Sequence, residues 1–215
     1  MKTENFSKLL KDSISKYLDI DAPCIFLFWK GRVGLYAILK AIDIKEGDEV
    51  VLHAFTCVVA VNPIIYLGAK PVYVDIDPLT LNIDHKKIEE KITKKSKVIL
   101  AQNTFGLSSN LDAIFEIANK HNLFVIEDCA HGFGGTYKGK KNGTISDASF
   151  FSSQWNKPFS TGIGGIAVAK NEIIAQKLKE IEAKAVKPNL KEKIMLKTLV
   201  EIKKGFLNQK FIGLH

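Results

Sequence analysis

The chain has 215 residues and a formal net charge of +8, with 46% hydrophobic and 25% charged residues. This composition is ordinary for a globular protein and excludes disordered and fibrous chains. The excess positive charge lies in residues 135–215, where lysines mix with glutamates and apolar residues as on a solvated helix face, so we expect no nucleic-acid partner.

No apolar run reaches the roughly 20 residues of a membrane-spanning helix, and the first eight residues lack the apolar segment of a signal peptide. We therefore expect a cytoplasmic protein without a membrane span. Cys24, Cys57 and Cys129 are widely spaced, which argues against a disulfide framework or a zinc ribbon, and we expect them to be buried. The histidines show no metal-ligand spacing, so no metal site is expected.

The first two thirds of the chain alternate strand-like and helix-like segments. A helical pattern over 6–18 precedes an apolar strand at 24–29 and a helix at 33–42. The alternation continues with strands at 49–52, 71–74, 97–101 and 123–127, and with helices at 57–67, 83–92 and 111–120. Strands that are almost wholly apolar indicate an α/β fold, in which a mostly parallel sheet lies between two helix layers.

The last third of the chain has a different pattern. The glycine-rich segment 132–139 predicts a loop and turn, followed by short strands at 148–152 and 165–169. Asn171 can cap a helix that runs to about residue 187, where Pro188 breaks it, and an amphipathic segment over 190–207 follows. We expect a large domain over 1–187 and an amphipathic helical tail over 188–215.

Residues that could carry chemistry follow the predicted strands, where α/β proteins place their ligands. They are Gly31-Arg32, Ala54-Phe55-Thr56, Asp128 with His131, and Ser152 with Lys157. Each alone has a structural explanation, such as a loop cap or a surface lysine. The stretch Gly134 to Lys141 lacks the Ser or Thr of a phosphate-binding loop, and no glycine pattern matches a dinucleotide fingerprint.

Four longer segments, in chain order, carry a family resemblance. They are GDEVVLHAFT (47–56), LGAKPVYVDIDPxTLNID (67–84), VIEDCAHGFGGTYKGKKNG (125–143) and SDASFFSSxxxK (146–157), followed by Gly164-Gly165, where x marks a residue that does not carry the resemblance. Together they resemble the DegT/DnrJ/EryC1/StrS family of pyridoxal-phosphate (PLP) sugar aminotransferases. The resemblance runs from about Gly31 to Asn171 and implies the large domain of a fold-type I aminotransferase.

The resemblance assigns roles to two residues at the reacting centre. Lys157 falls on the lysine that binds the cofactor as a Schiff base and then moves the proton during transamination. Asp128 falls on the carboxylate that pairs with the pyridinium nitrogen of PLP and keeps the ring an electron sink. Members that act as dehydratases have histidine at the lysine position, so Lys157 favours transamination.

Five further residues are implied to contact the cofactor. Gly31, at a helix start, would offer backbone amides to the phosphate, and Ser152 would add its hydroxyl. Arg32 replaces the commoner threonine, so that a guanidinium would meet the phosphate. His131 falls where many members have glutamine beside the ring oxygen, and Cys57 falls where many have an aromatic ring against the cofactor.

The family's activity implies an amino-acid donor, glutamate by analogy, and a nucleotide-linked keto sugar as acceptor, within a homodimer. Residues 188–215 lack the family's Gly-x-Asn-x-Arg segment and small C-terminal domain, so we expect either a fragment or a natural truncation. One apolar face of the tail (Ile194, Met195, Leu199, Ile202, Phe206) would pack on protein or, as the alternative, lie on a membrane. A non-catalytic remnant that binds PLP or a partner subunit is the alternative function.

Overall fold

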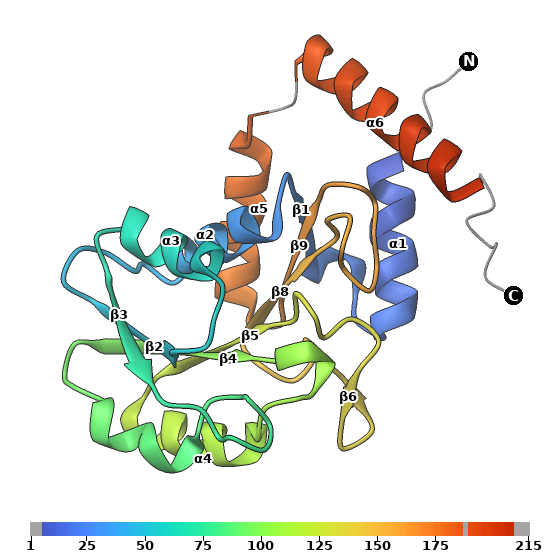
Figure 1. The fold of residues 1–215 in the computed structure, drawn as a ribbon. Helices are drawn as coiled ribbons and strands as arrows, with labels where there is room; N and C mark the ends of the chain where they lie inside the picture. The colour runs from blue at the N-terminus through green and yellow to red at the C-terminus, as the bar shows by residue number, and fades with distance from the viewer. Residues whose placement is uncertain (1–5, 187–188, 209–215) are drawn as a thin grey trace, which may run out of the picture. The chain divides into compact units, whose positions relative to one another are not determined.

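The computed structural model describes residues 6–186 and 189–208 (Figure 1). The chain forms two compact units that divide between Ala183 and Lys184. The domain boundary expected between residues 187 and 188 lies outside the described residues. Among the helices that are described, none is both long and apolar enough to cross a membrane.

One sheet forms the centre of the first unit, and within the described residues it has seven strands in the order β1-β9-β8-β5-β4-β2-β3 (Figure 1). The strands are β1 (Ile25–Phe28), β2 (Glu49–His53), β3 (Lys70–Val74), β4 (Ser96–Gln102), β5 (Phe124–Asp128), β8 (Ala148–Ser152) and β9 (Gly165–Ala169). Neighbouring strands from β8 to β3 pair in parallel. Strand β9 runs antiparallel to both β1 and β8. The mostly parallel sheet expected from the sequence is thus confirmed.

Helices cover both faces of this sheet (Figure 1). On one face pack α2 (Gly31–Ala41), α3 (Val58–Tyr66) and α5 (Glu172–Lys184), and on the other pack α1 (Phe6–Leu18) and α4 (Leu111–His121). Val50 and Leu52 of β2 face the first layer, whereas Val51 faces α4, because side chains alternate along a strand. Burial on both faces explains why the strands are continuous apolar runs in the sequence.

Helix ends follow the capping signals of the sequence. Asn171 caps α5 as expected, because its Oδ1 accepts from the N–H groups of Ile173 and Ile174 at 3.0 and 3.2 Å. Helix α2 begins at Gly31, two residues before its expected start. In the second unit, α6 (Leu190–Asn208) matches the amphipathic segment expected there, and the side chains of Leu190, Ile194, Met195 and Leu199 are exposed. The side chains of Ile202 and Phe206 lie outside the description.

The helix expected over 83–92 is wrong. Ile83 instead forms an isolated antiparallel bridge with Ile76, so the segment available for a helix is short. It folds as two 3₁₀ turns, η2 (His85–Lys87) and η3 (Glu89–Lys91). The Asp84 side chain accepts from the N–H of Lys86 and ends the extended segment before η2. Short helical pieces of this kind favour the tighter 3₁₀ form.

The glycine-rich segment expected as a loop and turn contains a small hairpin. Strands β6 (Thr136–Tyr137) and β7 (Lys140–Lys141) pair in antiparallel fashion. Lys138 and Gly139 between them have φ angles of 50° and 79°, which is the backbone of a two-residue type I′ turn. Lys138-Gly139 lacks the commoner Asn-Gly signal of this turn, so the sequence pattern did not predict the strands.

Candidate active site

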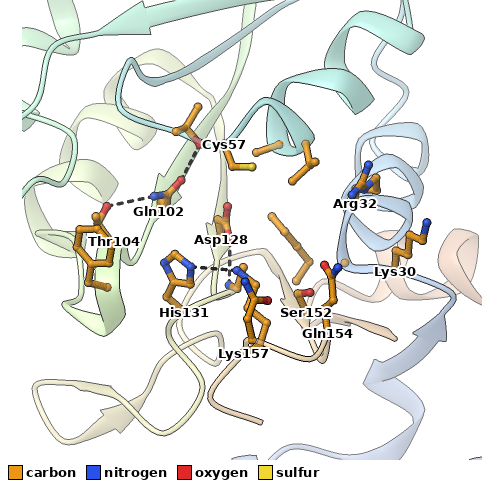
Figure 2. A pocket seen from close by; sticks show the side chains of 18 of the residues that line it. Lys30, Arg32, Cys57, Gln102, Thr104, Asp128, His131, Ser152, Gln154 and Lys157 are labelled. Atoms are coloured by element: carbon orange, nitrogen blue, oxygen red, sulfur yellow. Dashed lines mark hydrogen bonds between the residues drawn. The ribbon is translucent and has the colours of Figure 1, made fainter. Parts of the chain in front are cut away.

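A cavity of about 410 Å³ lies at the carboxyl edge of the parallel strands. Its walls come from the segments that follow β1, β2, β4, β5 and β8. All seven residues expected at the site line this cavity, namely Gly31, Arg32, Cys57, Asp128, His131, Ser152 and Lys157 (Figure 2). The strand-end positions therefore do converge on one concave site, as parallel sheets arrange them.

Lys157 and His131 point toward one another in this cavity (Figure 2). Lys157 Nζ lies 3.0 Å from His131 Nε2. Burial lowers the pKa of His131, and the positive charge of Lys157 lowers it further. A neutral imidazole follows at neutral pH, so that Nε2 accepts a hydrogen bond from the ammonium group of Lys157.

Asp128 is the last residue of β5 and is 5% exposed. Its Oδ1 accepts from the N–H of Ala130 at 2.9 Å. Burial raises the pKa of Asp128 to about 6, although the Ala130 hydrogen bond and the Lys157 charge both act in the opposite direction. A buried carboxylate with so little compensation is suited to a cationic partner inside the cavity.

Glu127, the residue before Asp128, fixes the end of β5 from the other face of the sheet. It is fully buried, and its two carboxylate oxygens accept from Ser146 Oγ at 3.0 Å, Gly143 N at 3.1 Å and Asn103 Nδ2 at 3.2 Å. These bonds tie the end of β4 and the turn before β8 to β5. Sequence reasoning missed this role, although an acidic residue inside an apolar strand was a usable signal.

The N-terminus of α2 forms one corner of the cavity. Its cap residue Lys30 is extended and forms no side-chain cap, and among the described residues no acceptor meets the N–H groups of Gly31 and Arg32. Ser152 and the Arg32 side chain line the same cavity (Figure 2). Free amides, a helix dipole and a guanidinium together favour a phosphate or another oxyanion.

Two glycines allow the close packing that builds this corner. A Cβ at Gly31 would lie 3.0 Å from Ser152 Cβ. A Cβ at Gly165 of β9 would lie 2.2 Å from the carbonyl carbon and oxygen of Lys30 and 2.5 Å from Gly31 N. The second contact involves backbone on both sides, so no side-chain rotation can relieve it. Glycine at 165 is therefore what lets α2 begin directly over the sheet.

We expect Gly165→Ala to lower the free energy of unfolding by about 2 to 3 kcal/mol, because the added methyl must displace the Lys30–Gly31 backbone. Urea unfolding measures the change. Gly34→Ala is the matched control, since a Cβ there would meet its nearest atoms at 3.6–3.7 Å and replace a glycine inside α2. That variant is expected to be unchanged or more stable by up to about 1 kcal/mol. Equal stability of the two variants would contradict the packing argument.

The expectation that all three cysteines are buried is wrong for two of them. Cys129 is buried, but Cys24 is only half-buried and Cys57 is exposed. Cys57 follows β2 and caps α3, so its thiol faces the cavity and not the core. The phenyl ring of Phe55, two residues earlier, also lines the cavity.

A hydrogen-bonded row lies in the cavity wall, and of its side chains only Thr56 was a candidate from the sequence, whereas Gln102 and Thr104 were missed. Thr56 Oγ1 donates to Gln102 Oε1 at 2.7 Å, Gln102 Nε2 donates to Thr104 Oγ1 at 3.2 Å, and Thr104 Oγ1 donates to the carbonyl of Leu81 at 3.1 Å. Figure 2 shows the hydrogen bond between Gln102 and Thr104. Gln102 ends β4, so its place after an apolar strand was the available signal. Phe105, which has a φ of 52°, stacks its ring on His131 at a centroid distance of 5.9 Å.

The cavity thus combines an amine, a buried carboxylate and an oxyanion corner. This set fits a ligand that carries a phosphate, a carbonyl group able to react with an amine, and a basic ring nitrogen. Volume and chemistry agree, because about 410 Å³ is within the range of small-molecule sites. Among the described residues, no group of three His, Cys, Asp or Glu side chains could hold a metal ion.

Comparisons with known proteins agree with this chemistry. Residues 12–203 match the DegT/DnrJ/EryC1/StrS aminotransferase family. The chain is 39% identical over 159 residues to GDP-perosamine synthase of Caulobacter vibrioides, a match that covers 74% of the chain and 43% of that enzyme. It is 39% identical over 155 residues to the UDP-2-acetamido-2-deoxy-3-oxo-D-glucuronate aminotransferase of Pseudomonas aeruginosa, covering 70% of the chain and 42% of the relative.

A solved structure shows the same fold. The PLP form of a putative sugar aminotransferase from Streptococcus pneumoniae superposes with a TM-score of 0.77 at 28% identity, over 82% of this chain and 50% of that one. The chain spans less than half the length of either of these two curated relatives.

Proposed function

The chain belongs to the DegT/DnrJ/EryC1/StrS aminotransferase family, and from this premise we propose that it is the PLP-binding part of a sugar aminotransferase. The proposed reaction moves an amino group from an amino acid, glutamate by family analogy, to a keto sugar carried on a nucleotide. Its product would serve polysaccharide or antibiotic sugar biosynthesis. We place the reaction in the cytoplasm, because Cys24, Cys57 and Cys129 are free thiols and a reducing compartment keeps cysteines in this form.

The observation that carries the proposal is the convergence of Lys157, Asp128 and the α2 N-terminus on one cavity. When bound, PLP supplies a reactive aldehyde and a ring that accepts electrons, which the protein's own side chains lack. The amides of Gly31 and Arg32, with the Ser152 hydroxyl, would hold its phosphate. Asp128 would pair with its ring nitrogen, and this pairing would offset the cost of burying the carboxylate.

The chain's own residues have separate tasks in this proposal. Lys157 would supply the amine that holds the cofactor and would also serve as the base that moves a proton. His131 is a neutral neighbour that can accept from Lys157 Nζ or donate to an oxygen of the ligand, depending on its tautomer. The Phe105 ring lies parallel to that imidazole, with the ring centroids 5.9 Å apart.

The test uses the full 215-residue chain with added PLP. Borohydride reduction followed by peptide mapping is expected to find one pyridoxyl group, on Lys157. A chain that takes up no cofactor, or one that is modified at scattered surface lysines, would contradict the proposal.

We also propose that two copies associate through α3. This helix exposes three large apolar side chains: Val58 is 64% exposed, Ile65 is 54% exposed and Tyr66 is 71% exposed. They lie on one face of α3, because Ile65 and Tyr66 follow Val58 by seven and eight residues, about two helical turns. Phe55 and Cys57, which line the cavity, directly precede the helix, so a second copy on this face would also cover the cavity mouth.

The double variant Ile65→Lys, Tyr66→Lys is expected to weaken self-association at least about 100-fold, because it places charges in the apolar centre of the interface. Sedimentation velocity at several concentrations measures the change. Ile173→Lys, a substitution at a 70% exposed residue of α5, is the control and should leave the dimer intact. An unmodified chain that sediments as a monomer at all concentrations would exclude this interface.

A further inference from the structure

Three aromatic rings stack in a column beside the cavity. The ring centroids of Tyr17 and Phe133 are 4.8 Å apart with planes inclined by 14°, and those of Phe133 and Phe159 are 4.9 Å apart with planes inclined by 22°. Lys141 Nζ lies 3.7 Å from the centre of the Tyr17 ring and closes the outer end. We call Tyr17, Phe133 and Phe159 the aromatic column.

Each ring of the column comes from a different part of the chain. Tyr17 belongs to α1, Phe133 to the segment after β5, and Phe159 to the segment after β8. Phe133 follows His131 by two residues, and Phe159 follows Lys157 by two residues. The central ring therefore joins the two segments whose side chains meet at the 3.0 Å contact between Lys157 Nζ and His131 Nε2.

The segment that carries Lys157 is closed on itself, so it can be positioned as one piece. Gln154 and Gly162 form an isolated bridge at its base. Ser153 Oγ and Thr161 Oγ1 are 2.7 Å apart across the same base. Gly162 packs under the Trp155 ring, because a Cβ there would lie 2.9 Å from a ring carbon. Phe159 is the ring by which this closed segment stacks on Phe133.

We propose that Phe133 is a positioning residue for Lys157: its ring, stacked between Tyr17 and Phe159, holds the Lys157 segment so that Nζ stays against His131. This inference rests on the proposed function for its consequence, which is rapid attachment of the cofactor. The geometric part concerns the cofactor-free chain alone. Phe133 also meets Phe151 edge-on at a centroid distance of 5.7 Å, so a purely structural role must be separated from positioning.

The pKa of His131 distinguishes a positioning role of Phe133 from a purely structural one. The nearby charge of Lys157 lowers this pKa, and a Lys157 that has moved away would no longer lower it. The experiment titrates the His131 ring protons by NMR in the cofactor-free chain and in Phe133→Leu, Lys157→Ala and the double variant. Phe133→Leu is expected to raise the pKa of His131 by at least half of the rise that Lys157→Ala causes. In the Lys157→Ala background, Phe133→Leu should add no further rise.

Further variants guard against a general loss of structure. Phe133→Tyr keeps the ring and should keep the lowered pKa. Phe159→Leu breaks the column from the other side and should reproduce the effect of Phe133→Leu. Phe26→Leu removes a ring that is 2% exposed and packs in the core between the sheet and α2, so it should lower stability without moving the pKa of His131.

The proposal is overturned if the pKa of His131 is the same in Phe133→Leu and the unmodified chain, or if the two substitutions raise it additively. A parallel measurement follows the rate at which PLP becomes attached to Lys157, which should fall about tenfold or more in Phe133→Leu. If the unmodified chain attaches no PLP, the proposed function fails, while the titration still decides whether Phe133 positions Lys157.

Discussion

Lys157→Ala is expected to abolish covalent attachment of PLP. Lys157 Nζ lies 3.0 Å from His131 Nε2, and Lys157 lines the same cavity as the first residues of α2. Without this amine, the aldehyde has no covalent partner there, and the remaining contacts hold the cofactor only by its phosphate and ring. After borohydride reduction and mass spectrometry, the variant should carry less than about a hundredth of the label on the unmodified chain.

Lys30→Ala is the matched control for this result, because Lys30 is the other lysine that lines the cavity. Its side chain forms no cap on α2, so its removal leaves the helix start intact. We expect Lys30→Ala to keep the label on residue 157. The opposite pattern, with label lost from Lys30→Ala and retained in Lys157→Ala, would show that the reactive amine belongs to Lys30 and not to Lys157.

Asp128→Asn should affect cofactor binding and protein stability in opposite directions. The amide cannot form an ion pair with a pyridinium, so the affinity for PLP should fall roughly 30-fold or more, which corresponds to about 2 kcal/mol. In the cofactor-free chain, the same change removes a buried charge that nothing fully compensates. The variant should therefore bind PLP more weakly and unfold less readily.

The stability gain depends on pH in a defined direction. The pKa of Asp128 is raised from 3.8 to about 6 by burial. A carboxyl group whose pKa is raised in the folded state does not lower the free energy of unfolding below about pH 4, where the group is protonated in both the folded and the unfolded chain. The loss of stability grows as the pH rises and reaches its full size above about pH 6. The difference in pKa corresponds to an upper value of about 3 kcal/mol.

Urea unfolding of the cofactor-free chain at several pH values measures this effect. Asp128→Asn should be more stable than the unmodified chain at pH 8, by up to about 3 kcal/mol, and the difference should shrink toward pH 4. Asp21→Asn, at an exposed aspartate, should show no comparable difference. A pH-independent gain would mean that burial of the charge is not its cause.

The parallel core was predictable because its strands carry their own signal. Residues 97–101 and 123–127 are apolar runs too short for helices, and the structure places both in the sheet with each end shifted by one residue. Asn171 was predictable for a similar reason, since a cap acts within three residues of itself. The expected helix over 83–92 failed because the pairing of Ile83 with Ile76 depends on the chain before it.

The cavity was predictable in part, because a strand end is a position that the sequence pattern shows directly. Asp128 and Ser152 end their strands, and Gly31 begins a helix that follows one. The contact between Lys157 and His131 was not predictable from spacing, since rings distant in sequence set the segments that carry them. The need for glycine at position 165 was likewise not predictable from its sequence neighbours, because it arises from contact with the backbone of Lys30.

The row from Thr56 to Leu81 has a chemical polarity that restricts what the cavity can receive. The carbonyl of Leu81 can only accept, so the single hydroxyl proton of Thr104 is committed to it, and Gln102 must turn its NH₂ toward Thr104. Gln102 Oε1 then takes the proton of Thr56. The Thr56 oxygen has only lone pairs left to offer, so a ligand that reaches it must bring a hydroxyl or ammonium proton of its own.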